Sequence, residues 1–178
     1  MMDLLPPVLL ALVLACALAT AVLRDVLAAI IAFATYSLGI AMIWVLLQAP
    51  DVGLTEAAVG AGVTTVLFLV TIAKTVRPPD DAIFESPDPK GLAVAVLLVA
   101  VLASTLGALP PIGSAETPVA QSRVTDYYLQ NAYHDTHVEN VVTAVLAAYR
   151  GFDTMGEAVV VFAAGVGLLV VLGREVFA

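Results

Sequence analysis

Long runs of apolar residues, separated by short polar stretches, make up most of the chain. Five of these runs carry almost no charge and are close to the length of about 20 residues that a helix needs to cross a bilayer. The pattern therefore predicts an all-α, polytopic membrane protein with about five spanning helices and one short interfacial or half helix. The expected spans are residues 4–23, 26–48, 54–73, 91–109 and 154–173.

The first run has a second interpretation, a secretory signal peptide that is cleaved from the mature protein. A signal peptide begins with positive charge, and Met1-Met2-Asp3 has none, although Ala17-Leu18-Ala19 resembles a cleavage site. Pro6-Pro7 suit the first turn of a helix, where backbone N–H groups have no partner within the helix. We therefore expect residues 4–23 to remain as an uncleaved span.

Proline and charge mark the connections between the spans. Residues 74–90 are rich in both and predict a solvated loop, which is the clearest boundary in the chain. Pro110-Pro111 ends the fourth span, and the residues after it predict a polar outer loop. The expected organisation is a three-helix module over residues 1–76, a charged and proline-rich loop over 77–90, and a second membrane module over 91–178 that contains the outer loop 110–137.

Two short motifs of the form Asp-Thr-x-x-Glu occur in the second module. They cover residues 135–139 and 153–157. Each contains the Thr-x-x-Glu capping box, which opens a helix when the threonine is the N-cap residue. Thr136 would then open a helix over residues 137–149, and Thr154 would open the last span.

The helix expected over residues 137–149 is too short to cross a membrane, because a helix of about 12 residues is only ~18 Å long. We therefore expect an amphipathic helix that either lies at the membrane interface or packs as a half helix within the subunit. Its apolar side chains fall on one face at helical spacing, namely Val138, Val141, Val142, Val145, Leu146 and Tyr149.

Composition excludes several classes of function. Hydrophobic residues make up 61% of the chain and charged residues 12%, which fits an integral membrane protein rather than a soluble globule. The net charge of −8 and the lack of a basic cluster argue against nucleic acid as a partner. The sequence has no catalytic triad, phosphate loop or cysteine pair, so we expect neither enzymatic activity nor a cofactor. His134 and His137 match no strong metal motif, and we expect no metal site.

Glu56 is the only charged residue within the third span. A carboxylate inside a membrane helix costs roughly 2.5–3.5 kcal/mol, so it usually has a partner, a wet cavity or a function. We therefore regard Glu56 as the first candidate for ion or proton handling. The alternative is an acid near the helix start that reaches back to the interface or to free N–H groups. Asp51 precedes the span as a candidate helix cap, because a carboxylate can accept hydrogen bonds from the first N–H groups.

Other residues of the spans are weaker candidates for the same path. Glu157 lies near the start of the last span, but the capping box explains it without any transport role. Lys74 follows the third span, where a cation also suits the negative end of the helix dipole. Gly53, Gly60 and Gly62 leave part of the third helix without side chains, which permits close packing or a local bulge.

Lysine and arginine set the expected orientation, because cytoplasmic loops are enriched in both. We expect a protein of the cell membrane with its N-terminus outside and its C-terminus in the cytoplasm. Glu56 and Glu157 would then lie at similar depth near the outer face. A six-span alternative, with residues 137–149 crossing the membrane, distributes the basic residues less well. In the five-span topology the basic residues inside are Arg24, Lys74, Arg77, Lys90 and Arg174.

Two stretches resemble known domains of multisubunit ion-transport complexes. Residues 50–62, Pro-Asp-Val-Gly-Leu-Thr-Glu-Ala-Ala-Val-Gly-Ala-Gly, closely resemble the signature of the MbhD family. Residues 140–146 and 149–157, the latter Tyr-Arg-Gly-Phe-Asp-Thr-Met-Gly-Glu, are similar to the MbhE domain. MbhD occurs in membrane-bound hydrogenases and in Mrp-type cation/proton antiporters. In the large A subunit of Mrp antiporters, domains similar to both sit together at the C-terminal end.

The resemblance implies a subunit of an assembly related to the membrane arm of respiratory complex I. Its third helix would carry a bulge and join proton and sodium paths, with Glu56 at the family's acidic position and Glu157 at the acid after the Arg-Gly-Phe-Asp-Thr motif. The chain lacks the long helix set with a mid-membrane lysine and glutamate that antiporter-like subunits use. It would therefore need partner subunits to exchange Na⁺ and H⁺ across the lipid bilayer. The alternatives are the same module in an energy-converting hydrogenase and a purely structural linker.

Overall fold

The computed structural model describes residues 4–74, 82–86 and 88–176 of the 178-residue chain. Residues 1–3, Arg77 and the expected module boundary between residues 76 and 77 lie outside the described residues. Two segments, η2 and η4, are π-helical, and η3 is a 3-10 helix. In chain order the elements are α1 (Leu5–Val22), α2 (Val26–Leu46), α3 (Pro50–Glu56), η2 (Ala57–Thr64), α4 (Thr65–Ala73), α5 (Pro89–Thr105), η3 (Leu106–Ala108), α6 (Arg123–Thr136), α7 (Val141–Ala144), η4 (Val145–Tyr149) and α8 (Gly151–Val176).

Helices account for nearly all of the described secondary structure, with an isolated β-bridge beside them. Among the described residues, five helices are long and apolar enough to cross a membrane, so the prediction of an all-α protein with five spans is confirmed. The six-span alternative is wrong for the part of the chain that the structure describes, because the short helix before the last span covers only Val141–Tyr149. The spans are Leu5–Val22, Val26–Leu46, Pro50–Ala73, Pro89–Ala108 and Gly151–Val170.

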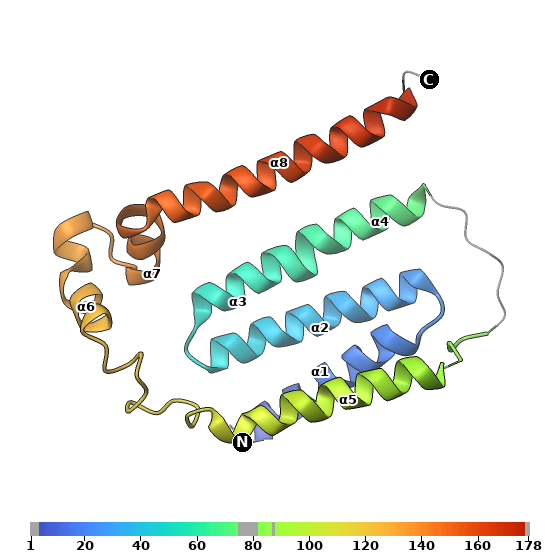
Figure 1. The fold of residues 1–178 in the computed structure, drawn as a ribbon, viewed down its shortest axis with the longest axis horizontal. Helices are drawn as coiled ribbons and strands as arrows, with labels where there is room; N and C mark the ends of the chain where they lie inside the picture. Colours follow the sequence, from blue (N-terminus) through green and yellow to red (C-terminus); the bar gives the residue numbers. More distant parts are fainter. Residues whose placement is uncertain (1–3, 75–81, 87, 177–178) are drawn as a thin grey trace. The chain divides into compact units, whose positions relative to one another are not determined.

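Helix α2 is the centre of the N-terminal helices. It packs against α1 on one side and against α3, η2 and α4 on the other (Figure 1). Glycine permits this close approach, since a Cβ at Gly39 would lie 2.7 Å from Val13 Cγ2 and one at Gly53 would lie 2.8 Å from Ala41 O. Lipid tails are as apolar as these side chains, so membrane helices associate through such close packing rather than through the hydrophobic effect.

The connection between the third and fourth spans returns to the turn between α1 and α2. Phe84 and Leu23 form an antiparallel bridge, and the Glu85 N–H donates to Val22 O at 2.8 Å. An ion pair of 3.3 Å between Arg24 Nε and Glu85 Oε2 supports the same contact. Both connections therefore lie at the same end of the helices, as the five-span topology requires.

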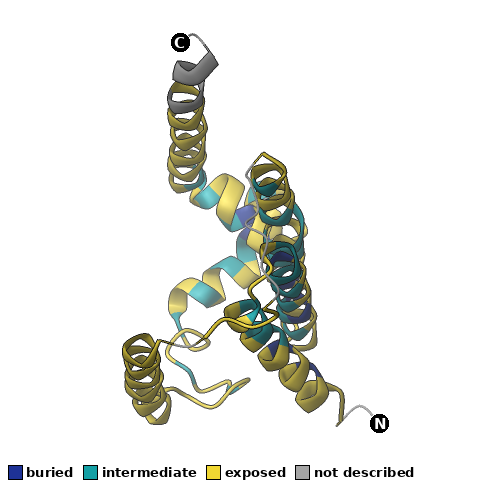
Figure 2. Cartoon of the chain, turned by 90° about the vertical axis from the view of Figure 1, so that its right-hand side faces the viewer, coloured by how far each residue is buried: buried dark blue, intermediate teal, exposed yellow. Residues whose placement is uncertain are grey.

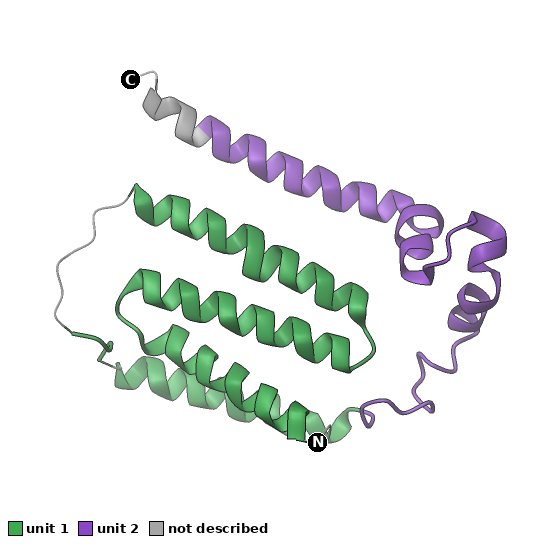
Figure 3. Ribbon diagram, turned by 180° about the vertical axis from the view of Figure 1, so that it is seen from behind, with its two compact units in different colours: residues 1–109 green, residues 110–178 purple. Residues whose placement is uncertain are grey.

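The chain divides into two compact units, Met1–Leu109 and Pro110–Ala178 (Figure 3). Within the first, every residue of α5 is exposed, and within the second, α8 is exposed over nearly all of its described side chains (Figure 2). Fully exposed apolar helices of this length need lipid or other membrane helices around them. The described fold thus buries little of its own apolar surface.

The predicted helix cap at Asp51 is wrong. Helix α3 begins at Pro50, and its N-cap residue is Ala49, whose side chain makes no capping hydrogen bond. Proline is well suited to the first helical position because its fixed φ matches the helix and its missing N–H is not needed there. Asp51 lies inside the first turn, where its negative charge still suits the positive end of the helix dipole.

The predicted cap at Thr136 is also wrong, because a helix that the sequence analysis missed occupies its place. Residues 110–137 were expected to form a loop, but α6 covers Arg123–Thr136, and His137 ends it in the left-handed conformation at φ 57°. The next helix is capped by Asn140, whose side chain accepts a hydrogen bond from Thr143 N–H at 2.9 Å. Helix α6 is polar and carries none of the long apolar pattern that marked the spans.

Candidate functional site

The third span changes its helical form directly after Glu56. It is α-helical over α3, π-helical over η2 from Ala57 to Thr64, and α-helical again in α4. π-Helical segments close their hydrogen bonds one residue further along the chain than an α-helix does, are rare, and occur frequently at functional sites. Here the Thr65 hydroxyl donates to the Gly60 carbonyl at 3.2 Å, five residues back, and so follows the wider turn.

Gly60 is the point at which α2 reaches the π-helical backbone. A Cβ built on Gly60 would lie 2.6 Å from Ser37 Oγ, 2.9 Å from Ser37 Cβ and 2.7 Å from Glu56 Oε1. Real Cβ atoms are not found this close to other heavy atoms. The missing side chain of Gly60 therefore leaves a slot in which the Ser37 hydroxyl and the Glu56 carboxyl both lie.

The polarity of this slot contrasts with its surroundings. Ser37 is 1% exposed, and among the described residues it is the one polar residue that is buried. Glu56 is half-buried. A carboxyl group and a hydroxyl group can pass or hold a proton, and each can accept a hydrogen bond. The slot thus combines a titratable acid, a second proton-bearing group and an irregular backbone.

The other predicted path residues occupy different places. Lys74 is exposed as the C-cap residue of α4, at the end of the span opposite to Glu56. Glu157 is exposed on α8 and belongs to the second unit. The role of each in an ion path stays a prediction.

Sequence reasoning missed Ser37. A lone serine in the apolar second span was the available signal, but serine is common in membrane helices, where it often bonds to its own backbone. The Thr20 and Thr35 hydroxyls do so, donating to Cys16 O at 2.8 Å and Ile31 O at 2.9 Å. Only the packing of α2 on η2 distinguishes Ser37 from them.

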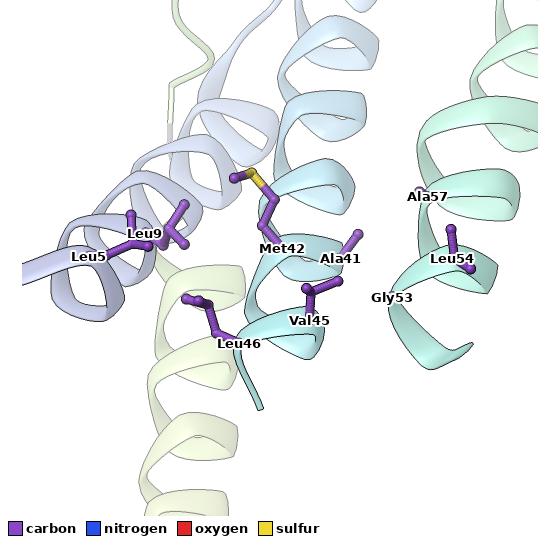
Figure 4. A pocket seen from close by; sticks show the side chains of 9 residues that line it. All are labelled: Leu5, Leu9, Ala41, Met42, Val45, Leu46, Gly53, Leu54 and Ala57. Carbon is purple, nitrogen blue, oxygen red and sulfur yellow. The ribbon is translucent and has the colours of Figure 1, made fainter. Parts of the chain in front are cut away.

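An apolar groove of about 270 Å³ lies beside the first turn of the third span. It is formed by α1, α2 and the start of the third span, where Gly53 and Ala57 line it (Figure 4). Its lining side chains are apolar throughout, so it offers no ligand to an ion. The groove suits a lipid chain or an apolar side chain from a neighbour, and it contributes no chemistry to the Glu56 slot.

Comparison with known families finds a match for each half of the chain. The MbhD family model, which describes the D subunit of MBH, matches residues 11–77, and the MbhE model, which describes the E subunit, matches residues 89–176. The chain thus carries a match to MbhD followed by a match to MbhE, and the two together span most of its length. The MbhD domain contains the Glu56 slot, and the MbhE domain contains α5 to α8.

The chain also matches curated proteins that are named as antiporter subunits. Proteins named "Putative antiporter subunit mnhA2" are 31% identical in Staphylococcus haemolyticus and 29% identical in Staphylococcus saprophyticus, each over 133 residues and 75% of this chain. One from Staphylococcus aureus strain JH9 is 25% identical over 136 residues, or 76% of the chain. The matched region covers only 16% of the length of each relative. The chain is thus similar to one segment of a much longer antiporter subunit.

The MbhE motif builds a corner between η4 and α8. An ion pair joins Arg150 Nη2 to Asp153 Oδ2 at 2.6 Å, and the Thr154 hydroxyl donates to Leu146 O at 2.8 Å. The predicted N-cap role of Thr154 is wrong, because α8 already begins at Gly151 and Thr154 ties its first turn to η4 instead. The Arg-Gly-Phe-Asp-Thr motif therefore has a structural explanation in the local turn.

A second polar cluster of the MbhE domain joins α6 to η4. The hydroxyls of Tyr127 and Tyr149 donate to Asp135 Oδ2 at 3.0 and 2.7 Å, and His134 Nδ1 lies 3.4 Å from Asp135 Oδ1. The Tyr128 ring lies 4.8 Å from that of Tyr149. Hydrogen bonds from Tyr149, Tyr127 and His134 lower the pKa of Asp135, and partial desolvation with the bond to Asp135 raises the pKa of Tyr149 to about 12.

An alkaline titration should reveal this cluster. We expect Tyr149 to keep its proton above pH 10 and to ionise near pH 12, because its pKa is raised to about 12. Because the pKa of Tyr149 is higher in the folded state than in the unfolded state, its hydrogen bond contributes fully to stability below about pH 10. That contribution is lost as the pH rises toward about 12. Ultraviolet absorbance of tyrosinate, recorded on the purified protein, measures this transition.

Two variants assign the transition. Tyr149→Phe should remove the highest step of the titration, and persistence of that step would show the assignment to be wrong. Asp135→Asn should lower the pKa of that step, although not fully to 10, because the desolvation of Tyr149 by its surroundings remains.

Proposed function

We propose that this chain is a membrane subunit of a multisubunit Na⁺/H⁺ antiporter complex and contributes to an ion or proton path at a subunit boundary. The observation that carries the proposal is Glu56, an acid within a span, placed against Ser37 at the start of a π-helical segment. The relatives named as antiporter subunits support a transport role rather than an enzymatic one.

In this proposal Glu56 carries the proton. A carboxyl group held among apolar helices can take up a proton from one side of a path and release it to the other. The π-helical turns that follow Glu56 support the proposal, since such turns occur frequently at functional sites. Lys74 and Glu157 are further candidates for the same path, at the end of the third span and near the start of the last.

Partner subunits complete the path. The described chain has five spans and few charged groups within them, so the remaining charged groups for exchange would come from neighbours. The exposed apolar faces of α5 and α8 are the surfaces available for those neighbours and for lipid. The orientation we propose has the N-terminus outside, so that Arg24, Lys74 and Lys90 face the cytoplasm.

The direct test is transport by the complete complex in sealed vesicles. We expect an imposed Na⁺ gradient to drive proton movement in vesicles that contain all subunits, and we expect complexes that lack this chain to lose it. A matched preparation with the chain restored in trans is the control. Equal Na⁺-driven proton movement with and without the chain would contradict the proposal.

A second candidate is the same module in an energy-converting membrane-bound hydrogenase, because the matching family models describe components of MBH. The purified complex distinguishes the two candidates by its composition. An antiporter complex contains membrane subunits without redox centres, whereas hydrogenase catalytic subunits that copurify with the chain would favour the second candidate.

A further inference from the structure

We propose that Ser37 is a positioning residue for Glu56. In this proposal the Ser37 hydroxyl holds the Glu56 carboxyl in the slot over Gly60. This inference rests on the proposed function, in which Glu56 carries the proton. It concerns the second span, which neither the sequence motifs nor the family resemblance singled out.

The geometry places both groups at one point. Ser37 Oγ and Glu56 Oε1 lie 2.6 and 2.7 Å from the position that a Cβ of Gly60 would occupy. The two oxygens therefore flank the same point beside Gly60, Ser37 from α2 and Glu56 from one turn earlier in its own helix, close enough for a rotation of either side chain to join them by a hydrogen bond. The packing of α2 against η2 holds this arrangement.

The chemistry of a hydroxyl suits both protonation states of the acid. Serine can donate a hydrogen bond to a carboxylate and can accept one from a protonated carboxyl group. A side chain that only donates, such as lysine, would favour one state and oppose proton release or uptake. Ser37 can thus keep the carboxyl in place while its proton arrives and leaves.

Burial makes the hydroxyl costly unless it has such a role. Placing a hydroxyl in an apolar environment without a compensating hydrogen bond costs free energy, and Ser37 is 1% exposed between apolar helices. Alanine would fill nearly the same space without that cost. The Glu56 carboxyl, which also borders the vacant Cβ position of Gly60, is the polar group that we assign to the Ser37 hydroxyl.

A double-mutant cycle in the complete complex tests the proposal. The variants are Ser37→Ala, Glu56→Asp and the pair together, and the readout is the initial rate of Na⁺-driven proton movement, with assembly measured by copurification. We expect Ser37→Ala to lower the rate roughly 10-fold, as for loss of one hydrogen bond to a charged group. In the Glu56→Asp background, where the shorter side chain withdraws from Gly60, we expect Ser37→Ala to cause little further loss.

Two additional variants make the result decisive. Ser104→Ala removes an exposed hydroxyl that donates to Val101 O on α5, and it should leave the rate unchanged. Ser37→Cys fills the same space with a weak donor, so it should assemble normally even if alanine disturbs the packing, and it should still lower the rate.

Several outcomes would overturn the inference. Full activity of assembled Ser37→Ala or Ser37→Cys, with Glu56→Gln inactive, would remove the positioning role and leave the proposed function standing. Independent, multiplicative losses in the cycle would show that Ser37 acts through packing and not through Glu56. Full activity of Glu56→Gln would overturn the proposed function itself, and the inference with it.

Discussion

Replacing Glu56 by glutamine is expected to abolish Na⁺-driven proton movement while the complex still assembles. Glutamine has nearly the same shape as glutamate, so the contacts over Gly60 remain, but an amide cannot take up or release a proton near neutral pH. Loss of a positioned proton-transfer group typically lowers a rate by about 100-fold or more. The measurement is the initial rate of proton movement in vesicles that carry the complete complex, compared at equal subunit content.

The control for this variant removes a carboxylate elsewhere. Glu116 is exposed in the segment before α6, and Glu116→Gln should leave both exchange and assembly unchanged. Exchange at the parental rate in Glu56→Gln would reduce this acid to a group that only completes the helix start. The chain would then act as a structural linker in its complex.

Replacing Gly60 by alanine is expected to destabilise the subunit and to lower transport. The new Cβ would lie within 3 Å of Ser37 Oγ, Ser37 Cβ and Glu56 Oε1, so α2 and η2 must separate or the carboxyl must leave the slot. Overpacking of a tight contact costs typically about 1–3 kcal/mol. The thermal stability of the purified complex, followed by loss of copurifying subunits on heating, measures the first effect, and vesicle transport measures the second.

Gly62 provides the matched control within the same π-helical segment. A Cβ there would lie 3.5 Å from Ala57 O, which is ordinary van der Waals contact. Alanine is favoured over glycine in a helix by roughly 0.5–1 kcal/mol, so Gly62→Ala should be neutral or slightly stabilising. If Gly60→Ala and Gly62→Ala behaved alike, the close contact at Gly60 would not matter for stability.

The spans and the main acid could be predicted from the sequence because each depends on local composition. A run of about 20 apolar residues needs no tertiary information to be read as a span, and Glu56 stood out as the one charge in such a run. The glycines of the third span also indicated a possible bulge. The π-helical segment follows at Ala57–Thr64, where two of them lie.

The features that the sequence analysis missed depend on contacts between distant residues or on competition between nearby signals. Ser37 gains its place only because α2 packs on η2 at Gly60. Thr136 matched a capping box, but α6 continued through it and Asn140 provided the cap that the next helix uses. Helix α6 itself went unseen because its polar sequence lacks the long apolar pattern on which the other helices were predicted.

The exposure of α5 and α8 affects how a polypeptide like this one can form part of a longer chain. Neither helix buries side chains in the described part of its own span, so each is held by the bilayer and by whatever surrounds it. A polypeptide of this kind can be joined to a longer chain, as the match to 16% of much larger relatives indicates, without rebuilding an internal core.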